Sequence, residues 1–369
     1  MKPKAIVFLS VLFLNLLSCA QDKNPKNKEH FHEVVVSDLN IPWGFIFLPD
    51  DSMLITEKSG ELIHYKEGKK TMVNGLPEVT VLGQGGLMDI ELHPNYRDNG
   101  WIYLSFASSE DDNEDTANTT IMRAKLEGNV LTEKQVIYKA TPDSGRGQHF
   151  GSRIEFDNNG YLFFSVGDRG DRDVNPQDIS LDCGKVYRLK DDGSIPEDNP
   201  FINKPEAKKA IYCYGNRNIQ GMIKHPETGE IWTHEHGPKG GDEINIIKSG
   251  KNYGWPLISY GINYTGTKFT EHTSLPGMEQ PLYYWVPSIA PSGMEFISSD
   301  IYPGWKGNLL VGSLKFQYLN RCVIENNKVV KQEQLISGLG RVRSVKQGPD
   351  GYIYAGVENV GIVKIIPKK

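Results

Sequence analysis

A run of polar side chains bounded by glycines spans Tyr214 to Gly221 and has the sequence YGNRNIQG. Two related motifs follow it along the chain, EHGPKGGDEIN from Glu235 and KNYGWP from Lys251. An arginine beside an asparagine in such a loop offers hydrogen-bond donors in a fixed geometry, which suits a planar, oxygen-rich anion. The spacing of these residues therefore predicts a site for a small molecule or cofactor.

The elements that must position these residues are short β-strands. A turn rich in Pro, Asp, Asn and Gly, followed by a β-rich run, recurs about six times, with copies that begin at Leu48, His93, Phe156, His225, Tyr302 and Gly348. No sustained helical periodicity competes with this pattern. We predict an all-β fold, a six-bladed β-propeller whose long inter-strand loops form an axial cofactor site. The strand His32 to Val36 is expected to pair with the C-terminal blade and close the ring.

The composition limits the classes of partner. The chain has 369 residues, with 41 Lys plus Arg against 46 Asp plus Glu, so it lacks the basic excess that nonspecific nucleic-acid binding requires. A β architecture of this length is often a single unit. We predict three segments: a signal peptide over 1–18, a polar tether over 19–31 and one propeller domain over 32–369.

The N-terminus has the pattern of a targeting segment. Lys2 and Lys4 precede an apolar run from Ala5 to Leu17, which is too short for a convincing membrane span. The run ends in LLSC at Cys19 and resembles a bacterial lipobox, in which the cysteine is lipidated. This predicts an exported lipoprotein in the periplasm or on the outer membrane, attached to the membrane only through its lipid. The alternative is an ordinary signal peptide with an incidental cysteine.

Three further cysteines remain, Cys183, Cys213 and Cys322. An odd number allows at most one disulfide within the chain, and the sequence does not say which. No spacing suggests zinc. The favoured interpretation is that they are small buried apolar side chains.

From about Ile41 to the C-terminus, the chain resembles the pyrroloquinoline quinone (PQQ) dependent soluble glucose and aldose sugar dehydrogenases, and most closely the aldose sugar dehydrogenase branch. Several separate motifs carry the resemblance in the family's order. Besides the three loop motifs above, they are GQGGLMDIELHP from Gly83, GQHFGSRIEFD from Gly147, SVGDRG from Ser165, GKVYRLKDDGSIPEDNPF from Gly184, IAPSGMEF from Ile289, GNLLVGSLK from Gly307 and RVRSVKQGPDGYIY from Arg341.

The resemblance implies a set of catalytic residues. His149 matches the family's base, which takes the proton from the anomeric hydroxyl of the sugar while hydride passes to the quinone. A histidine suits this role because its ordinary pKa lies close to working pH. Arg217 and Asn218 match the residues that stabilise the negative charge on the quinone oxygen. A histidine that only binds a loop backbone, and an arginine that only pairs with a carboxylate, are the structural alternatives.

The resemblance also implies how PQQ is held. Its three carboxylates need neutralising in a partly dehydrated site, and Lys315, Arg341 and Arg343 match the family's cationic clamp. Arg341 and Arg343 are two apart, so in a strand they share a face; a solvated charged face is the alternative for this pair. The full set of expected cofactor contacts is Gln84, His149, Arg217, Asn218, His236, Lys315, Arg341 and Arg343.

Two calcium ions are implied in the same way. One would bridge protein and PQQ through backbone carbonyls of the turn at Gly237 and Pro238. Hard oxygen ligands of this kind suit calcium, which would act as a Lewis acid on the quinone. A second, structural calcium is implied at Glu243 and Tyr253, the latter through its backbone oxygen. A Gly-Pro pair alone would predict only a turn.

The sequence departs from the family pattern at two positions: Asn216 stands where histidine is usual, and Ile219 where proline is usual. The function expected from the resemblance is oxidation of aldose sugars to lactones, with electrons passed to an external quinone or cytochrome. Two other classes stay open: an extracellular binding propeller without a cofactor, and a calcium-dependent lactonase. Which sugar is oxidised, and whether the protein forms a homodimer, is left open.

Overall fold

The recurring β-rich runs form the central strands of six four-stranded antiparallel sheets. The computed structural model describes residues 30–111 and 113–367. In blade 1 the strands are β2 (Pro42–Phe47), β3 (Met53–Glu57), β4 (Leu62–Lys66) and β5 (Lys69–Met72). In blade 2 they are β6 (Leu87–Leu92), β7 (Trp101–Ser108), β8 (Asn118–Glu127) and β9 (Val130–Lys139), with the short helix α1 (Tyr96–Asn99) between β6 and β7. In blade 3 they are β10 (Ile154–Phe156), β11 (Leu162–Val166), β12 (Lys185–Leu189) and β13 (Ile211–Tyr214).

The other three blades have the same plan. Blade 4 contains β14 (Ile219–Lys224), β15 (Ile231–Glu235), β16 (Asp242–Ile246) and β17 (Tyr283–Trp285). Blade 5 contains β18 (Pro291–Phe296), β19 (Leu309–Ser313), β20 (Tyr318–Glu325) and β21 (Lys328–Leu335). Blade 6 contains β22 (Val342–Gln347), β23 (Ile353–Val357) and β24 (Gly361–Pro367), and its fourth strand is β1 (His30–Ser37).

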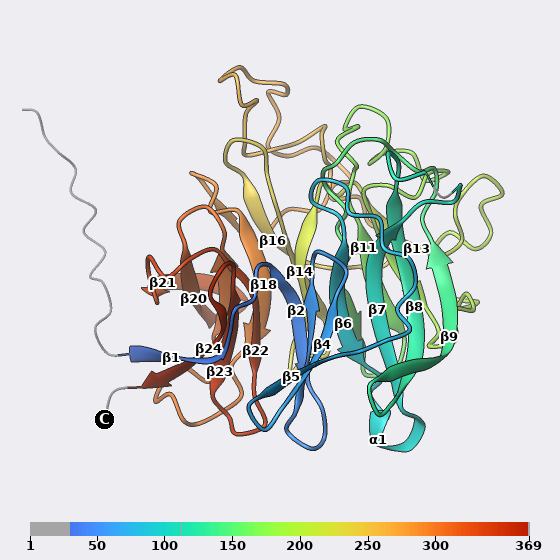
Figure 1. The fold of residues 1–369 in the computed structure, drawn as a ribbon. Coiled ribbons are helices and arrows are strands. Elements are labelled where there is room, and N and C mark those ends of the chain that lie inside the picture. Colours follow the sequence, from blue (N-terminus) through green and yellow to red (C-terminus); the bar gives the residue numbers. More distant parts are fainter. Residues whose placement is uncertain (1–29, 112, 368–369) are drawn as a thin grey trace, which may run out of the picture.

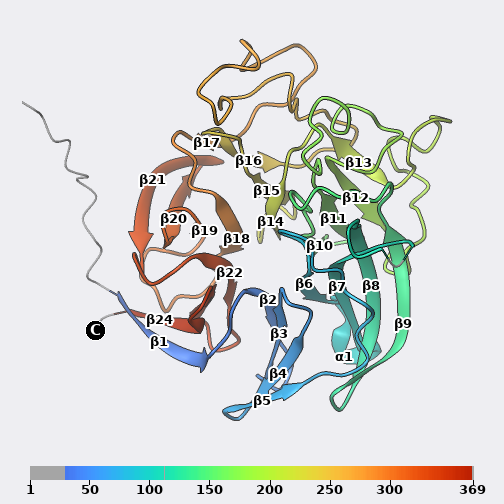
Figure 2. The ribbon, with the colours of Figure 1, turned by 45° about the horizontal axis from the view of Figure 1, so that its top comes forward.

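The first strand of each blade lies nearest the axis. The pairs β2–β6, β6–β10, β10–β14, β14–β18, β18–β22 and β22–β2 are all in contact, so the inner strands form a closed ring. Figures 1 and 2 show the six sheets placed around this ring. The predicted six-bladed β-propeller is therefore confirmed.

The turn signals of the sequence have a common place in the fold. Each recurring turn joins the inner strand of a blade to its second strand, as at 48–52 between β2 and β3 and at 157–161 between β10 and β11. The loops that lead into the inner strands lie on the opposite face. One of them is the segment 140–153, and a second long segment, 247–282, joins β16 to β17 and extends above the sheets in Figure 1. The second face is therefore the one that longer loops can shape into a site.

Apolar residues on both faces of the strands fill the space between blades. All five residues of β11 are buried. Phe156 and Phe164 of blade 3 pack in one cluster with Tyr103 and Ile121 of blade 2. This agrees with the near-continuous apolar strands in the sequence, because a strand with a sheet on either side has no solvent face.

The N-terminal strand closes the ring as predicted. β1 pairs antiparallel with β24, from Phe31 opposite Ile366 to Ser37 opposite Gly361. The strand is longer than the expected range of His32 to Val36. The predicted signal peptide, the lipidated Cys19 and the tether as far as residue 29 lie outside the described residues and stay predictions.

The three cysteines of the described chain, Cys183, Cys213 and Cys322, are buried free thiols, as the sequence favoured. Burial raises the pKa of each, that of Cys322 to about 12. Among helices in the described ranges, none has the length and apolar character needed to cross a bilayer.

Candidate functional site

His149 is held in a strained backbone conformation between blades 2 and 3. Its φ is 58°, in the left-handed region, where a non-glycine residue costs about 1–3 kcal/mol. Its backbone N–H donates to Oε1 of Gln84 at 2.9 Å, and its carbonyl is so close to Gly167 that a Cβ there would lie 2.1 Å away. A strained backbone of this kind persists only where the surrounding contacts hold it in place, and such residues cluster at functional sites. The strain therefore supports a functional role for His149.

Asp168 fixes the imidazole of His149. The ring Nδ1 lies 2.6 Å from Oδ1 of Asp168, and this oxygen also accepts the backbone N–H of Gly170 at 2.7 Å. The other carboxylate oxygen accepts the indole N–H of Trp255 at 2.8 Å. With Nδ1 donating to the carboxylate, Nε2 carries the lone pair, as a general base requires.

The surroundings keep the imidazole neutral. Burial lowers the pKa of His149 below its usual 6.5, and the nearby charge of Arg217 acts in the same direction, while Asp168 partly opposes them. Burial also acts to raise the pKa of Asp168, but the hydrogen bond and charge of His149, together with Arg217, outweigh it and lower that pKa. The pair is thus a neutral imidazole on an ionised carboxylate near neutral pH.

Arg217 and Asn218 lie in the connection between β13 and β14 and are both buried. The Arg217 guanidinium donates to the carbonyl of His236 at 3.0 Å and lies 5.3 Å from the ring centre of Trp255. Oδ1 of Asn218 accepts the backbone N–H of Gly151 at 3.1 Å, two residues after His149. Asn218 also accepts the backbone N–H of His236 through its carbonyl at 3.1 Å. The three predicted catalytic residues therefore belong to one hydrogen-bonded cluster.

A cavity of about 370 Å³ opens beside this cluster at the axis. Of the predicted cofactor contacts, Gln84, Asn218, His236, Arg341 and Arg343 line it. His149 and Arg217 do not line the cavity, but the residue that follows each of them, Phe150 and Asn218, does. Trp43 and Phe150 add aromatic faces. A volume in this range, with polar groups that converge from several blades, is typical of small-molecule sites.

The cations of the cavity are organised around one carboxylate. The Glu358 carboxylate accepts hydrogen bonds from Nε of Arg341 at 2.7 Å and from Nε of Arg343 at 3.0 Å. Burial lowers the pKa of Arg343, and Glu358 opposes that shift. Lys58, which sequence reasoning missed, also lines the cavity. Burial lowers the pKa of Lys58, and the charge of Arg343 adds to this. Three cations facing one carboxylate leave the cavity with a positive excess that suits an anionic ligand.

Lys315 is the exception among the expected clamp residues. It is exposed, and its ammonium lies 5.1 Å from the ring centre of Phe316. It is not among the residues that line the cavity, so in this structure it stands at the rim.

The turn at Gly237 and Pro238 is anchored by a buried aspartate. Asp242 accepts the backbone N–H groups of Gly237 at 2.9 Å and Ile289 at 2.7 Å, and also the hydroxyl of Ser288. Both turn residues are buried, and a Cβ at Gly237 would lie 2.2 Å from the carbonyl oxygen of Gly240. Carbonyl oxygens crowded in this way are the donor type that calcium prefers.

Glu243 lies directly opposite Glu235 in the β15–β16 pair. Burial raises the pKa of Glu243 to about 8, and the neighbouring carboxylate of Glu235 adds to the shift. The Glu235 carboxylate accepts hydrogen bonds from the side-chain amide of Asn216 and from the backbone N–H of Arg217. A cation bound here would favour the ionised form of Glu243 and lower its pKa again. Tyr253 is buried, with its hydroxyl donating to the carbonyl of Ile246 at 2.6 Å. Among the described residues, no group of three or more His, Cys, Asp or Glu side chains is placed to hold a metal, so a calcium here would depend on backbone oxygens.

The two departures from the family pattern lie behind the cavity. Asn216 donates to Glu235 at 3.0 Å and supports the carboxylate that holds the Arg217 backbone. Ile219 is buried in a core cluster with Phe163 and Met222. Neither side chain lines the cavity.

Three residues that the sequence analysis did not single out, Asp168, Trp255 and Glu358, form hydrogen bonds within the site. Asp168 and Trp255 stand within the motifs SVGDRG and KNYGWP, so their positions were visible but not their roles. Trp255 and Asp168 are separated by 87 residues, and only the fold brings them together. Glu358 lies outside every motif, and a carboxylate opposite Arg341 and Arg343 had no signal in the sequence.

Comparison with known proteins identifies the family of the chain. The family model for glucose/sorbosone dehydrogenase matches residues 39–364. The aldose sugar dehydrogenase YliI of Escherichia coli is 40% identical over 346 residues, covering 91% of this chain and 92% of the relative. The crystal structure of the soluble E. coli enzyme in its apo form has a TM-score of 0.87 at 39% identity, covering 92% of this chain and all of that one.

A more distant solved relative is the PQQ-bound form of the aldose sugar dehydrogenase from Streptomyces coelicolor. It has a TM-score of 0.74 at 25% identity and covers 91% of this chain and 98% of that one. The resemblance inferred from the motifs is confirmed: this chain belongs to the glucose/sorbosone dehydrogenase family of sugar-oxidising enzymes.

Proposed function

We propose that this protein oxidises aldose sugars to lactones with PQQ as cofactor and passes two electrons to an external quinone or cytochrome. The observation that carries the proposal is the neutral His149 held on Asp168 beside a cavity with a positive excess. The solved PQQ-bound relative supports the choice of cofactor.

The chemistry of the donor set fits PQQ. The cofactor is a planar tricarboxylate, and the cavity offers three cations, Lys58, Arg341 and Arg343, and is also lined by Trp43 and Phe150. Gln84 and Asn218 add amide groups on the same wall. Charge-assisted hydrogen bonds from arginine to carboxylate are among the strongest available to such a site.

When bound, the quinone would accept the hydride from the anomeric carbon of the sugar. The chain's part is to handle the proton and the developing charge. Nε2 of His149 takes the proton of the anomeric hydroxyl, and Asp168 stabilises the imidazolium that results. Arg217 and Asn218 supply a positive charge and an amide donor near the reacting groups, in a buried setting where such groups act strongly. Loss of one hydride and one proton converts the aldose into its lactone.

The test is PQQ titration of the purified, calcium-loaded domain, followed by sugar-dependent bleaching of a redox dye across a panel of aldoses. We expect saturable PQQ binding and turnover that requires both PQQ and sugar. Binding without turnover on any aldose would reject the reaction. No PQQ binding by folded protein would instead favour a binding propeller that works without a cofactor.

Calcium should act on stability as well as on cofactor binding. We propose that the turn at Gly237 and Pro238 and the site at Glu243 and Tyr253 each hold one ion. A ligand that binds only the folded state at 100 times its Kd adds about 2.7 kcal/mol to the free energy of unfolding. Chelation should therefore lower Tm by several degrees, with full recovery when calcium, but not magnesium, is returned.

Glu243→Gln provides the matched control for the calcium experiment, because it removes one negative charge from the second site and leaves the Gly237 turn unchanged. The variant should lose part of the calcium-dependent rise in Tm. A Tm that does not respond to chelation in the parent protein would reject both sites.

A further inference from the structure

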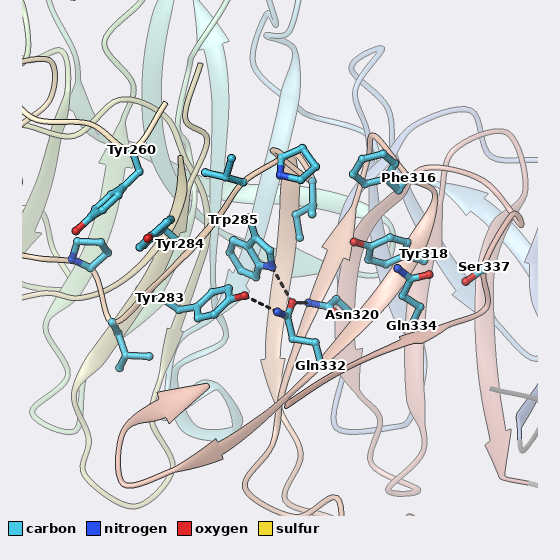
Figure 3. A pocket seen from close by; sticks show the side chains of 15 residues that line it. Tyr260, Tyr283, Tyr284, Trp285, Phe316, Tyr318, Asn320, Gln332, Gln334 and Ser337 are labelled. Atoms are coloured by element: carbon cyan, nitrogen blue, oxygen red, sulfur yellow. Dashed lines mark hydrogen bonds between the residues drawn. The ribbon is translucent and has the colours of Figure 1, made fainter. Parts of the chain in front are cut away.

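A second cavity, larger than the axial one, lies away from the axis. A groove of about 1000 Å³ lies between blade 4 and blade 5, lined by β17, the segment that follows it, and the upper parts of β20 and β21. Figure 3 shows its side chains. The volume exceeds that of the axial cavity, about 370 Å³, by more than twofold. We refer to it as the aromatic groove.

Aromatic faces stand on both sides of the groove. Tyr260 and Tyr284 stack with ring centres 3.8 Å apart and planes at 11°. Across the groove, Phe316 and Tyr318 lie parallel at 7°, with centres 6.2 Å apart (Figure 3). Tyr284 is 42% exposed and Phe316 is 44% exposed. Burying aromatic rings on folding is favourable, so ring faces kept open at two sides of one groove indicate a ligand surface.

Amide side chains form the floor between these rings. Oε1 of Gln332 accepts the indole N–H of Trp285 and an amide N–H of Asn320, both at 2.7 Å, and Nε2 of Gln332 donates to the hydroxyl of Tyr283 at 2.6 Å. These bonds are drawn in Figure 3. Gln334 also lines the groove and has no side-chain hydrogen bond to another described residue. The floor is thus a fixed amide network with donor and acceptor groups left for a ligand.

The groove carries no formal charge. None of its 15 lining residues is Asp, Glu, Lys, Arg or His, although these charged types are frequent in the chain. A protein partner or an anionic ligand would be matched by charge at the rim. Aromatic faces with amides and hydroxyls between them instead match a neutral ligand that has apolar C–H faces and many hydroxyl groups.

The groove and the axial cavity share a wall. Ile289 lines the groove, and the next residue, Ala290, lines the cavity. Leu314 likewise faces the cavity, while Phe316, two residues later, faces the groove. The two segments are joined by backbone bonds from Leu314 to Ala290 at 3.0 Å and from Lys315 to Ile289 at 3.2 Å. The groove and the axial cavity therefore adjoin along these two segments.

We propose that the aromatic groove binds the glycosyl units of a neutral oligosaccharide whose reducing-end aldose occupies the axial cavity. The inference rests on the proposed function for the orientation of the sugar and deepens it by naming the substrate class. The enzyme then oxidises a tri- or tetrasaccharide more efficiently than the free monosaccharide, because the groove adds binding energy remote from the reacting carbon.

The experiment compares kcat/KM for glucose with that for maltotetraose and cellotetraose, in the parent enzyme and in Tyr284→Ala and Phe316→Ala. At least one tetrasaccharide should exceed glucose by about tenfold, and each variant should remove most of that advantage without changing kcat/KM for glucose. Tyr264→Ala is the matched control, because Tyr264 is a 73% exposed tyrosine that does not line the groove. This variant should leave kcat/KM unchanged for glucose and for the tetrasaccharides.

A second readout separates this proposal from the proposed function. The protein without PQQ is titrated calorimetrically with the methyl glycosides of the same tetrasaccharides, which the reaction cannot consume. Binding that is lost in Tyr284→Ala supports the groove even if no dehydrogenase turnover is found.

Three results would overturn the proposal and leave sugar oxidation intact. The first is turnover of glucose with no tetrasaccharide binding, and the second is equal kcat/KM for short and long sugars. The third is a set of groove variants that raise only the KM for a quinone acceptor, which would make the groove an acceptor site.

Discussion

Replacing His149 with alanine lowers kcat for sugar oxidation by about 10²–10⁴-fold, the usual contribution of a positioned general base. PQQ affinity changes much less, because the cations that face the cavity are untouched. Stopped-flow reduction of bound PQQ measures the chemical step, and titration with PQQ measures affinity in the same preparation. If reduction of bound PQQ proceeds at the parent rate in His149→Ala, another group is the base.

The pH profile tests the same assignment without removing the ring. The neutral imidazole is the active form, so kcat/KM is full above the pKa of His149 and is lost as pH falls through it. Burial lowers that pKa, which places the acid limb below the ordinary value of 6.5. Asp168→Asn removes a contact that raises the pKa, so the acid limb moves to still lower pH while kcat falls through loss of orientation. An acid limb above 6.5, or one that moves upward in Asp168→Asn, would contradict this arrangement.

Arg343→Met raises the Kd for PQQ by about 100-fold or more. Arg343 is a largely buried cation that shares Glu358 with Arg341, and its loss removes a charged donor and leaves Glu358 less compensated beside an anionic ligand. Fluorescence titration with PQQ gives the value directly. An unchanged Kd would show that the cofactor carboxylates are held elsewhere.

A double variant separates the two causes of this loss. Arg343→Met combined with Glu358→Gln removes the uncompensated carboxylate as well, so it should recover part of the affinity. Lys364→Met is the control on the same blade. It breaks an exposed ion pair with Asp350, 2.7 Å apart, at the turn that joins β22 to β23, on the face away from the cavity. Its PQQ affinity should equal that of the parent protein.

The fold could be predicted because the turn motifs of the sequence all fall at the same place in each blade, between its first and second strands. The turns at 48–52 and 157–161 each end an inner strand, and the apolar runs after them, such as Leu162–Val166, are buried on both faces. Local turn chemistry and strand burial therefore specify each blade almost independently. The uneven spacing of the copies is explained by loops such as 247–282, whose length varies without disturbing the sheets.

The site was predictable only as far as its motifs reached. Gln84, Asn218 and Arg343 come from separate short motifs, and the fold brings them together around one cavity. The charged groups that lie beside these residues, Glu358 and Lys58, could not be predicted from the sequence. Glu358 meets the arginines only through the pairing of β22 with β23, and Lys58 reaches the cavity from the turn between β3 and β4 of blade 1. The aromatic groove was missed for a similar reason, since its two walls come from different blades.

Blade 6 is built from both ends of the chain, which affects how the fold can be completed. Its outermost strand is made first by the ribosome and its other three strands last, so the ring cannot be completed until the whole chain has emerged. Arg341, Arg343 and Glu358 all belong to this final blade or its loops. The arginines and the carboxylate that face the axial cavity are therefore brought together only when blade 6 is completed, at the last step of folding. We expect a chain truncated at either end to lose this arrangement, and an anionic ligand that binds there to stabilise the closed ring.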